Sequence, residues 1–285
     1  MHSARFGLLV SIMLLNVPVW ARQAQTPVIQ TQSATTLPPA TKDPQAVSVL
    51  TQALGASGGI PAITAITDYT ATGTGTWYQT SDHTFEGAVT INGTASGQLR
   101  FDAHLPAGVR SYAVNRGRSL WKNEDERLTQ APAPDTRVPS SDAFPYKPPM
   151  FAGGFASPHI QIAAVLNDSL LEVSYKGSVQ IDGRPVHEIQ VRRLLPGSSD
   201  PNDPLAEYSS MDFFIDASTY QVVMTQDVVP KHVIHQLRYS DYRPVNAVVV
   251  PFAITEFMGS QQIWAIHLDQ ISYNSGLQDS SFDLQ

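Results

Sequence analysis

The stretch RYSDYRPVNAVVVPFAITEF, residues 238–257, joins a polar and aromatic segment to an almost wholly apolar one through a turn at Pro244–Asn246. Polar and apolar side chains alternate before the turn, with the period of two that is typical of a β-strand. After the turn both faces are apolar, since Val249 and Ala253 lie opposite Phe252 and its neighbours. The stretch therefore predicts a β-hairpin whose second strand is covered on both faces.

The same alternation recurs on both sides of this hairpin. From residue 171 onward, turn-forming residues such as Asp182-Gly183 separate the alternating segments, so each strand is expected to be joined to the next by a hairpin. About eleven strands are expected in all, at residues 66–80, 86–93, 97–105, 108–121, 171–181, 186–194, 210–216, 219–229, 232–243, 247–257 and 263–273.

Two segments have the period of short amphipathic helices. Residues 43–54 begin with Asp43-Pro44, a typical N-cap and first helical position, and apolar residues also recur on one face of residues 158–168. The strands turn about thirty side chains inward, and two such helices cover about ten of them. The sequence therefore predicts a mainly β fold, a curved antiparallel sheet of about eleven strands that forms an incomplete β-barrel with two short helices at its mouth.

An incompletely closed sheet leaves an apolar hollow, which is a typical ligand site. Seven residues on the expected inner face are predicted to contact a hydrophobic ligand: Trp77, Phe101, Phe213, Val222, Met224, Phe252 and Trp264. Packing of the same side chains in a filled core is the alternative interpretation.

A proline-rich segment at residues 131–158 is expected to cover this hollow. It contains seven prolines, which exclude regular structure, yet it also carries large apolar side chains that a bare linker would lack. These side chains predict a lid formed by Phe144, Tyr146, Met150, Phe151 and Phe155.

The N-terminus has the features of an export signal. Arg5 precedes an apolar run from Phe6 to Leu15, and cleavage is expected after Ala21. Residues 22–42 are rich in Gln, Thr and Pro and predict a flexible leader, followed by a single half-barrel domain at residues 43–285. The apolar run is too short for a membrane span, and the chain has no cysteine for a lipid anchor. A periplasmic or secreted protein without a membrane span is expected.

Several function classes are disfavoured by the sequence. The net charge of −7, without a basic stripe, argues against nucleic-acid binding. Gly55–Gly59 matches the G-x-S-x-G pattern of nucleophilic serines, but it follows a helix and precedes a strand, so a helix end is the better interpretation. The histidines are scattered without the spacing of a metal site. Neither a catalytic residue, nor a cofactor, nor a metal is therefore expected.

The C-terminal third resembles the LolA/LolB-like superfamily of exported lipoprotein carriers. Four features carry the resemblance: a strand ending in Tyr239-Ser240-Asp241-Tyr242-Arg243, the apolar strand Val248–Phe252, a last strand ending in Tyr273-Asn274, and a close at Leu277, Asp279, Phe282 and Asp283. The resemblance implies an incomplete antiparallel β-barrel with helices at its mouth and an interior that takes acyl chains.

Residues and resemblance together predict a noncatalytic exported carrier or sensor. It would bind an acyl chain, a lipid or a lipidated protein in the hollow. The alternative is an envelope scaffold or protein-interaction module, which would have a filled core, an envelope protein as its partner and no small ligand.

Overall fold

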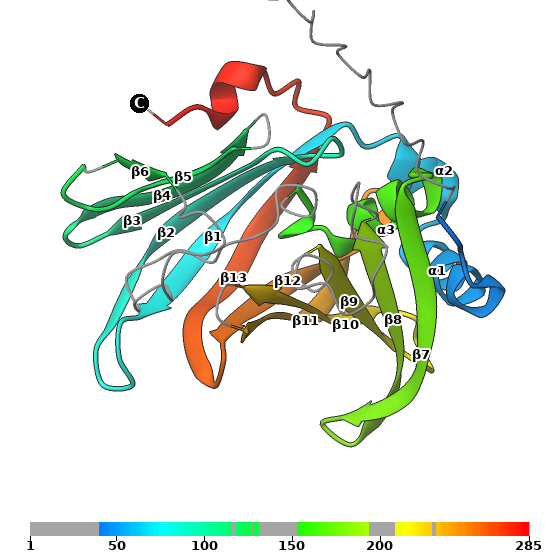
Figure 1. Ribbon diagram of the computed structural model, residues 1–285. Coiled ribbons are helices and arrows are strands. Elements are labelled where there is room, and N and C mark those ends of the chain that lie inside the picture. Colours follow the sequence, from blue (N-terminus) through cyan, green and yellow to red (C-terminus); the bar gives the residue numbers. More distant parts are fainter. Residues whose placement is uncertain are drawn as a thin grey trace, which may run out of the picture. The chain divides into compact units, whose positions relative to one another are not determined.

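The structure, a computed structural model, is built around one antiparallel sheet (Figure 1). It describes residues 40–115, 118–126, 128–130, 153–193, 209–229 and 232–284. The strands are β1 Asp68–Tyr78, β2 Thr84–Thr94, β3 Leu99–Leu105, β4 Gly108–Asn115, β5 Arg118–Lys122, β6 Leu128–Gln130, β7 Leu171–Ile181, β8 Arg184–Arg193, β9 Ser210–Asp216, β10 Val222–Val229, β11 Val233–Val245, β12 Val248–Met258 and β13 Gln261–Tyr273.

The order of the strands leaves the sheet open. The order within the described residues is β6-β5-β4-β3-β2-β1-β13-β12-β11-β10-β9-β8-β7, so the edges are β6 and β7. These two strands are consecutive in the sequence, with α3 between them. The first and last strands pair in the middle of the sheet, from Tyr69 opposite Tyr273 to Trp77 opposite Trp264. The mainly β, curved and unclosed antiparallel sheet predicted from the sequence is confirmed (Figure 1).

The described residues form 13 strands, two more than expected. Residues 108–121 were expected as one strand, but they form β4 and β5, which pair with Asn115 opposite Arg118. The polar stretch at residues 115–118 contains a glycine and is a turn signal, which the expectation of a single strand overlooked. The short strand β6 was not expected either.

Two helices were expected, and the described residues contain three α-helices. They are α1 Pro44–Ala56, α2 Ile60–Thr64 and α3 Pro158–Asn167, and a 3-10 helix, η2, spans Asp279–Phe282. The Asp43 carboxylate caps α1 by accepting hydrogen bonds from the backbone N–H groups of Gln45 and Ala46, at 2.7 and 3.3 Å. The helix α2 has only five residues, too few to show a helical period, which is why periodicity did not predict it.

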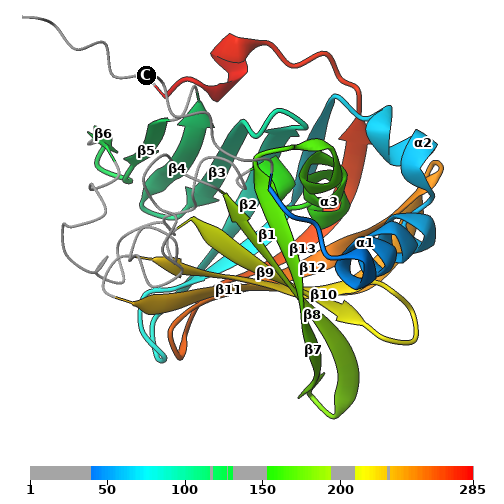
Figure 2. The ribbon, with the colours of Figure 1, turned by 45° about the vertical axis from the view of Figure 1, so that its right-hand side comes forward.

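The helix α3 lies inside the curved sheet. Figure 2 shows α1 and α3 beside each other at one end of the sheet, where α1 contacts both α3 and β7. Because α3 lies between α1 and the sheet, nearly its whole surface is buried, polar His159 and Gln161 included. A helix with this burial is a core element, unlike a surface helix, which exposes one polar face.

The β11–β12 hairpin predicted from residues 238–257 is confirmed, with a small shift in the turn. The turn lies at Asn246-Ala247, where Asn246 adopts a left-handed conformation with φ 55°. Pro244, expected in the turn, belongs to β11 and lies opposite Val249.

The glycine-rich segment after α1 packs against this turn. A Cβ atom on Gly58 would lie 2.1 Å from the carbonyl oxygen of Ala247, so only glycine permits the approach. The Ser57 carbonyl accepts a hydrogen bond from the Val249 N–H at 3.1 Å. The G-x-S-x-G match therefore ends α1 and joins it to β12.

The chain before α1 is attached to the edge of the sheet. Lys42, in the predicted leader, forms a parallel bridge with Val173 of β7. Residues 1–39 lie outside the described residues, so the signal peptide, the rest of the leader and the domain boundaries stay predictions. Among the described residues, no helix has the length and apolar character needed to cross a bilayer.

Candidate ligand-binding site

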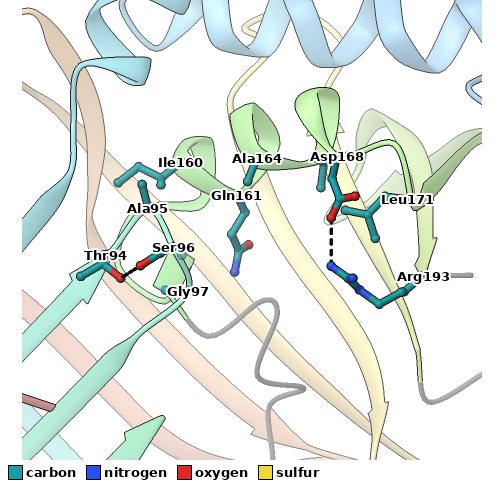
Figure 3. Close-up of a pocket in the computed structure, with 13 residues that line it drawn as sticks. Thr94, Ala95, Ser96, Gly97, Ile160, Gln161, Ala164, Asp168, Leu171 and Arg193 are labelled. Carbon is teal, nitrogen blue, oxygen red and sulfur yellow. Dashed lines mark hydrogen bonds and ion pairs between the residues drawn. The ribbon is translucent and has the colours of Figure 1, made fainter. Parts of the chain in front are cut away.

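A pocket of about 170 Å³ lies at the mouth of the half-barrel, beside α3 (Figure 3). It brings together the β2–β3 turn, the start and C-terminal half of α3, and the ends of β7 and β8. Its lining residues are Thr94, Ala95, Ser96, Gly97, Gly153, Gly154, Ile160, Gln161, Ala164, Val165, Asp168, Leu171 and Arg193. The pocket therefore joins strands from the two halves of the sheet.

Two glycines bring the chain before α3 close to the β2–β3 turn. A Cβ atom on Gly153 would lie 2.4 Å from the carbonyl oxygen of Thr94, and one on Gly154 would overlap the side chain of Gln161. The turn itself is held by the Thr94 hydroxyl, which accepts from the Gln98 N–H at 3.0 Å and bonds the Ser96 hydroxyl at 2.9 Å. One wall of the pocket is therefore a tightly packed turn.

The opposite wall carries an ion pair. Arg193 at the end of β8 donates from Nη2 to the Asp168 carboxylate at 2.9 Å, and both side chains are about 30% exposed. Gln161 points from α3 into the space between this pair and the β2–β3 turn (Figure 3). Ile160 and Leu171 provide apolar surface, so the pocket suits the end of an apolar chain with a polar atom at the rim.

Below the mouth, six of the seven predicted ligand residues belong to one buried cluster. These six are Trp77, Phe101, Phe213, Val222, Phe252 and Trp264, each exposed by 6% or less. The ring of Phe101 contacts Trp264 edge-on, with centroids 5.2 Å apart. These six residues therefore share the concave face of the sheet, and the chain itself covers them.

Met224 does not belong to this group, and its assignment to the hollow is corrected. A β-bulge between Val222 and Met224 shifts the register of β10 against β9 by one residue. Strict alternation would place both residues on one face, but the shift turns Met224 to the opposite face, where it packs with Val186 and Phe214. The bulge follows from pairing with β9, and no residue in the sequence marks it.

One residue of the predicted lid is found deep in the core. Phe155 is 4% exposed, and its ring contacts Phe101 edge-on with centroids 5.9 Å apart. The remaining lid residues, Phe144, Tyr146, Met150 and Phe151, lie outside the described residues. An aromatic side chain from the segment that precedes α3 thus occupies the concave face of the sheet.

A buried cation lies over one of the predicted ligand residues. The Arg110 guanidinium lies 3.7 Å from the ring centroid of Trp77, and Arg110 is 5% exposed. Nε and Nη2 each donate to one oxygen of Glu124 at 3.0 Å, a bidentate pair. No local pattern in the sequence predicts this cluster, because Glu124 reaches Arg110 from beyond the neighbouring strand.

Three ionisable side chains also meet on the concave face. His235 is completely buried between Asp227 and Glu256, with Nδ1 2.7 Å from Asp227 Oδ1 and Nε2 2.6 Å from Glu256 Oε1. Burial alone lowers the pKa of His235, but the two carboxylates outweigh it and raise the pKa to about 9. At neutral pH both ring nitrogens donate protons, so neither serves as a general base.

The sequence does not predict this triad as a whole, because only the pair Asp227 and His235 lies across one hairpin. Asp227 and His235 are eight residues apart in the sequence, and the β10–β11 register pairs them directly. Glu256 lies opposite Leu237 on the next strand, beside His235. Its approach depends on the β11–β12 register and gives no local pattern.

Comparisons with known proteins agree with this fold. No protein-family model matches the chain, and no curated protein matches it. Three solved structures are similar to it, each with 84% of this chain covered. One is an outer membrane lipoprotein-sorting protein domain from Vibrio parahaemolyticus, with 8% identity, 96% of that chain covered and a TM-score of 0.51. A DUF1329 family protein from Desulfovibrio piger has 9% identity, 96% coverage and a TM-score of 0.52. A LolA superfamily protein from Nitrosomonas europaea has 10% identity, 97% coverage and a TM-score of 0.52.

Proposed function

On the premise that the chain has a LolA/LolB-like fold, we propose that it is a noncatalytic exported carrier or sensor of a hydrophobic molecule. The ligand is an acyl chain, a lipid or a lipidated protein, held between the concave face and α3. One observation carries the proposal. Phe155, which comes from outside the sheet, packs on Phe101 in a sheet whose edges do not meet.

The position of Phe155 suggests how a ligand enters. Phe155 precedes α3 and is separate from the strands, so it can leave the concave face without breaking strand pairs. An acyl chain that replaces it gains about 0.8 kcal/mol for each methylene removed from water. The pocket beside Gln161 and Arg193 is the proposed entrance, because Gly153 and Gly154, which line it, directly precede Phe155 and because it has both apolar and polar lining.

The test is lipid analysis of protein purified without detergent. Native mass spectrometry and extraction are expected to find bound lipid in the wild-type chain and little in Phe252→Asp, which places a charge on the concave face. Ile234→Asp is the matched control, because Ile234 is apolar but 43% exposed, and it should keep the lipid. Circular dichroism must confirm that both variants fold. An empty wild-type protein that also takes no lipid from vesicles would contradict the proposal.

The absence of catalysis is part of the proposal and has its own test. The Ser57 carbonyl accepts a hydrogen bond from the Val249 N–H of β12. Ser57 follows a helix, whereas a nucleophilic serine of the G-x-S-x-G type lies in a turn from a strand to a helix. No hydrolysis of p-nitrophenyl acyl esters above the buffer rate is expected. Hydrolysis that Ser57→Ala abolishes, in a variant that circular dichroism shows to be folded, would show that the chain is an enzyme.

Export is proposed on the signal-like N-terminus. Expression in a bacterium with a periplasm should yield a mature chain that begins at Arg22, as read by N-terminal sequencing. An uncleaved chain in the cytoplasm would contradict this part of the proposal.

An envelope scaffold is the second candidate, and the filled contact among Phe101, Trp264 and Phe155 favours it. A scaffold would carry no lipid but would retain an envelope protein in a pull-down. Loss of that protein when residues 131–152 are deleted would identify the segment as the contact.

A further inference from the structure

A second pocket, of about 200 Å³, lies on the face of the sheet opposite α3. Alternation along the strands defines this face. Leu237, Tyr239 and Ile254 belong to the main core, so Arg238 and its partner Thr255, which alternate with them, lie on the other face. The lining residues are Ile181, Asp182, Arg184, Val186, Val223, Met224, Arg238, Tyr239, Ser240 and Thr255.

The base of this pocket is apolar. Val186 is completely buried and Met224 is 5% exposed, and together with Phe214 they form a cluster separate from the main core. Ile181 and Val223 line the pocket beside them and are half-buried. A flexible thioether such as Met224 adapts well to short apolar chains of different shape.

The rim of the pocket is cationic. Arg184 and Arg238 are exposed and line the same space, and in the part of the chain that the structure describes neither forms an ion pair with a carboxylate. The Arg238 guanidinium lies 4.8 Å from the ring centroid of Phe257, which holds it over the surface. Asp182 also lines the rim, beyond salt-bridge distance of either arginine.

Two hydroxyl groups complete the polar side of the pocket. Ser240 and Thr255 line it together with the two arginines. Guanidinium groups and hydroxyls are hydrogen-bond donors that suit a carboxylate or a phosphate. A chain with a net charge of −7 has no general attraction for anions, so anion binding here would depend on this local pair of cations.

We propose that this pocket binds an anionic amphiphile, with a carboxylate or phosphate head at Arg184 and Arg238 and a short apolar tail over Met224. The volume supports a short tail, because sites for larger ligands usually exceed about 300 Å³. This site is separate from the concave face and does not depend on the proposed carrier function.

Octanoate is the first probe, titrated into the full mature chain and followed by calorimetry. Octanol keeps the tail without the charge, while inorganic phosphate and acetate keep a charge without the tail. Octanoate is expected to bind at least about tenfold more tightly than each of them, because charged hydrogen bonds and apolar burial act together. Octyl phosphate, compared with octanoate, distinguishes a phosphate head from a carboxylate head. Octanol or phosphate binding as tightly as octanoate would overturn the proposal.

Variants locate the octanoate site. Arg184→Gln and Arg238→Gln are each expected to weaken octanoate at least about tenfold. Ser240→Trp should abolish binding by filling the pocket while leaving both charges. Arg243→Gln is the matched control. This variant removes the same charge from the same strand, but Arg243 lies outside the pocket, so the variant should bind octanoate as tightly as the wild type.

One result would separate this site from the proposed carrier site. Octanoate binding that survives Arg184→Gln, Arg238→Gln and Ser240→Trp but disappears in Phe252→Asp would place the ligand on the concave face. That outcome would overturn the pocket proposal and support the carrier function.

Discussion

Asp227 and His235 face each other across the β10–β11 hairpin, with Oδ1 and Nδ1 2.7 Å apart, and Glu256 meets the other nitrogen of the ring. All three side chains are exposed by 6% or less and lie on a face that is otherwise mainly apolar and aromatic. Buried charges are tolerated only when each is paired, so the stability of the sheet should depend on the complete triad.

Replacement of His235 by Gln should strongly destabilise the protein. The variant leaves two carboxylates buried without a cation, which costs about 3–5 kcal/mol in the free energy of unfolding. Urea unfolding at pH 7 measures the loss. His267→Gln is the control, because His267 is exposed on β13, and its effect should stay within about 0.5 kcal/mol. Equal effects of the two substitutions would show that the triad does not stabilise the fold.

The triad also predicts that stability falls at high pH. The folded-state pKa of His235 is about 9, above the ordinary value of 6.5, so the folded state binds the proton more tightly than the unfolded state. The contribution is fully present below pH 6.5 and is lost as the pH rises through about 9. Urea unfolding between pH 6 and 10 should show this decline in the wild type and a much flatter profile in His235→Gln. Parallel profiles would contradict the prediction.

His159 on α3 should have the opposite pH dependence. Its burial lowers the pKa from 6.5 to about 3, so the folded state holds the neutral ring and the unfolded state binds the proton first. This contribution is present above pH 6.5 and is lost as the pH falls towards 3. Hydrogen exchange across Pro158–Asn167 should accelerate between pH 7 and 5, after correction for intrinsic rates. His159→Gln should remove much of that acceleration, and an unchanged pH response in this variant would argue against the prediction.

Phe155→Ala should loosen the cover of the concave face. Truncation of a buried phenylalanine costs about 3–5 kcal/mol in the free energy of unfolding. If a ligand replaces this ring, the variant should also take up more of a fluorescent long-chain fatty acid than the wild type. Ile234→Ala, at an exposed position, should change neither quantity. Destabilisation without greater uptake would favour a filled scaffold core.

Alanine substitutions at Gly153 and Gly55 compare a glycine that is tightly packed at the mouth with one that has open space around it. Gly153→Ala would bring Cβ within 2.4 Å of the Thr94 carbonyl oxygen, and the required shift is expected to cost about 1–3 kcal/mol. Gly55 lies in α1 with no neighbouring atom within 4 Å of a Cβ, so Gly55→Ala should stabilise the protein by about 0.5–1 kcal/mol. Thermal unfolding compares the two, and a shift of the same sign in both would contradict the packing described at the mouth.

Alternation along the chain was sufficient to predict most of the sheet. The seven strands from β7 to β13 and the helices α1 and α3 lie where their periods place them. Six of the seven predicted inner-face residues, including Phe101 and Trp264, share one buried cluster. Local periodicity was successful here because it records which side of each element meets water.

The failures came from turns, bulges and strand register, which alternation along one strand does not record. The bulge in β10 moved Met224 to the other face, and the reversal between β4 and β5 divided one expected strand. The triad around His235 and the contact of Arg110 with Trp77 and Glu124 also depend on register and on side chains from separate strands.

The sequence by itself determined most of the strands, the two main helices and the inward apolar residues, because each of these is a property of a few adjacent residues. Only the tertiary structure decided that β1 pairs with β13, that Phe155 packs on Phe101, and that Asp227, His235 and Glu256 share one buried site. These contacts form when the whole sheet curves, since burial and strand register are set by all the strands together and leave no periodic trace in any one of them.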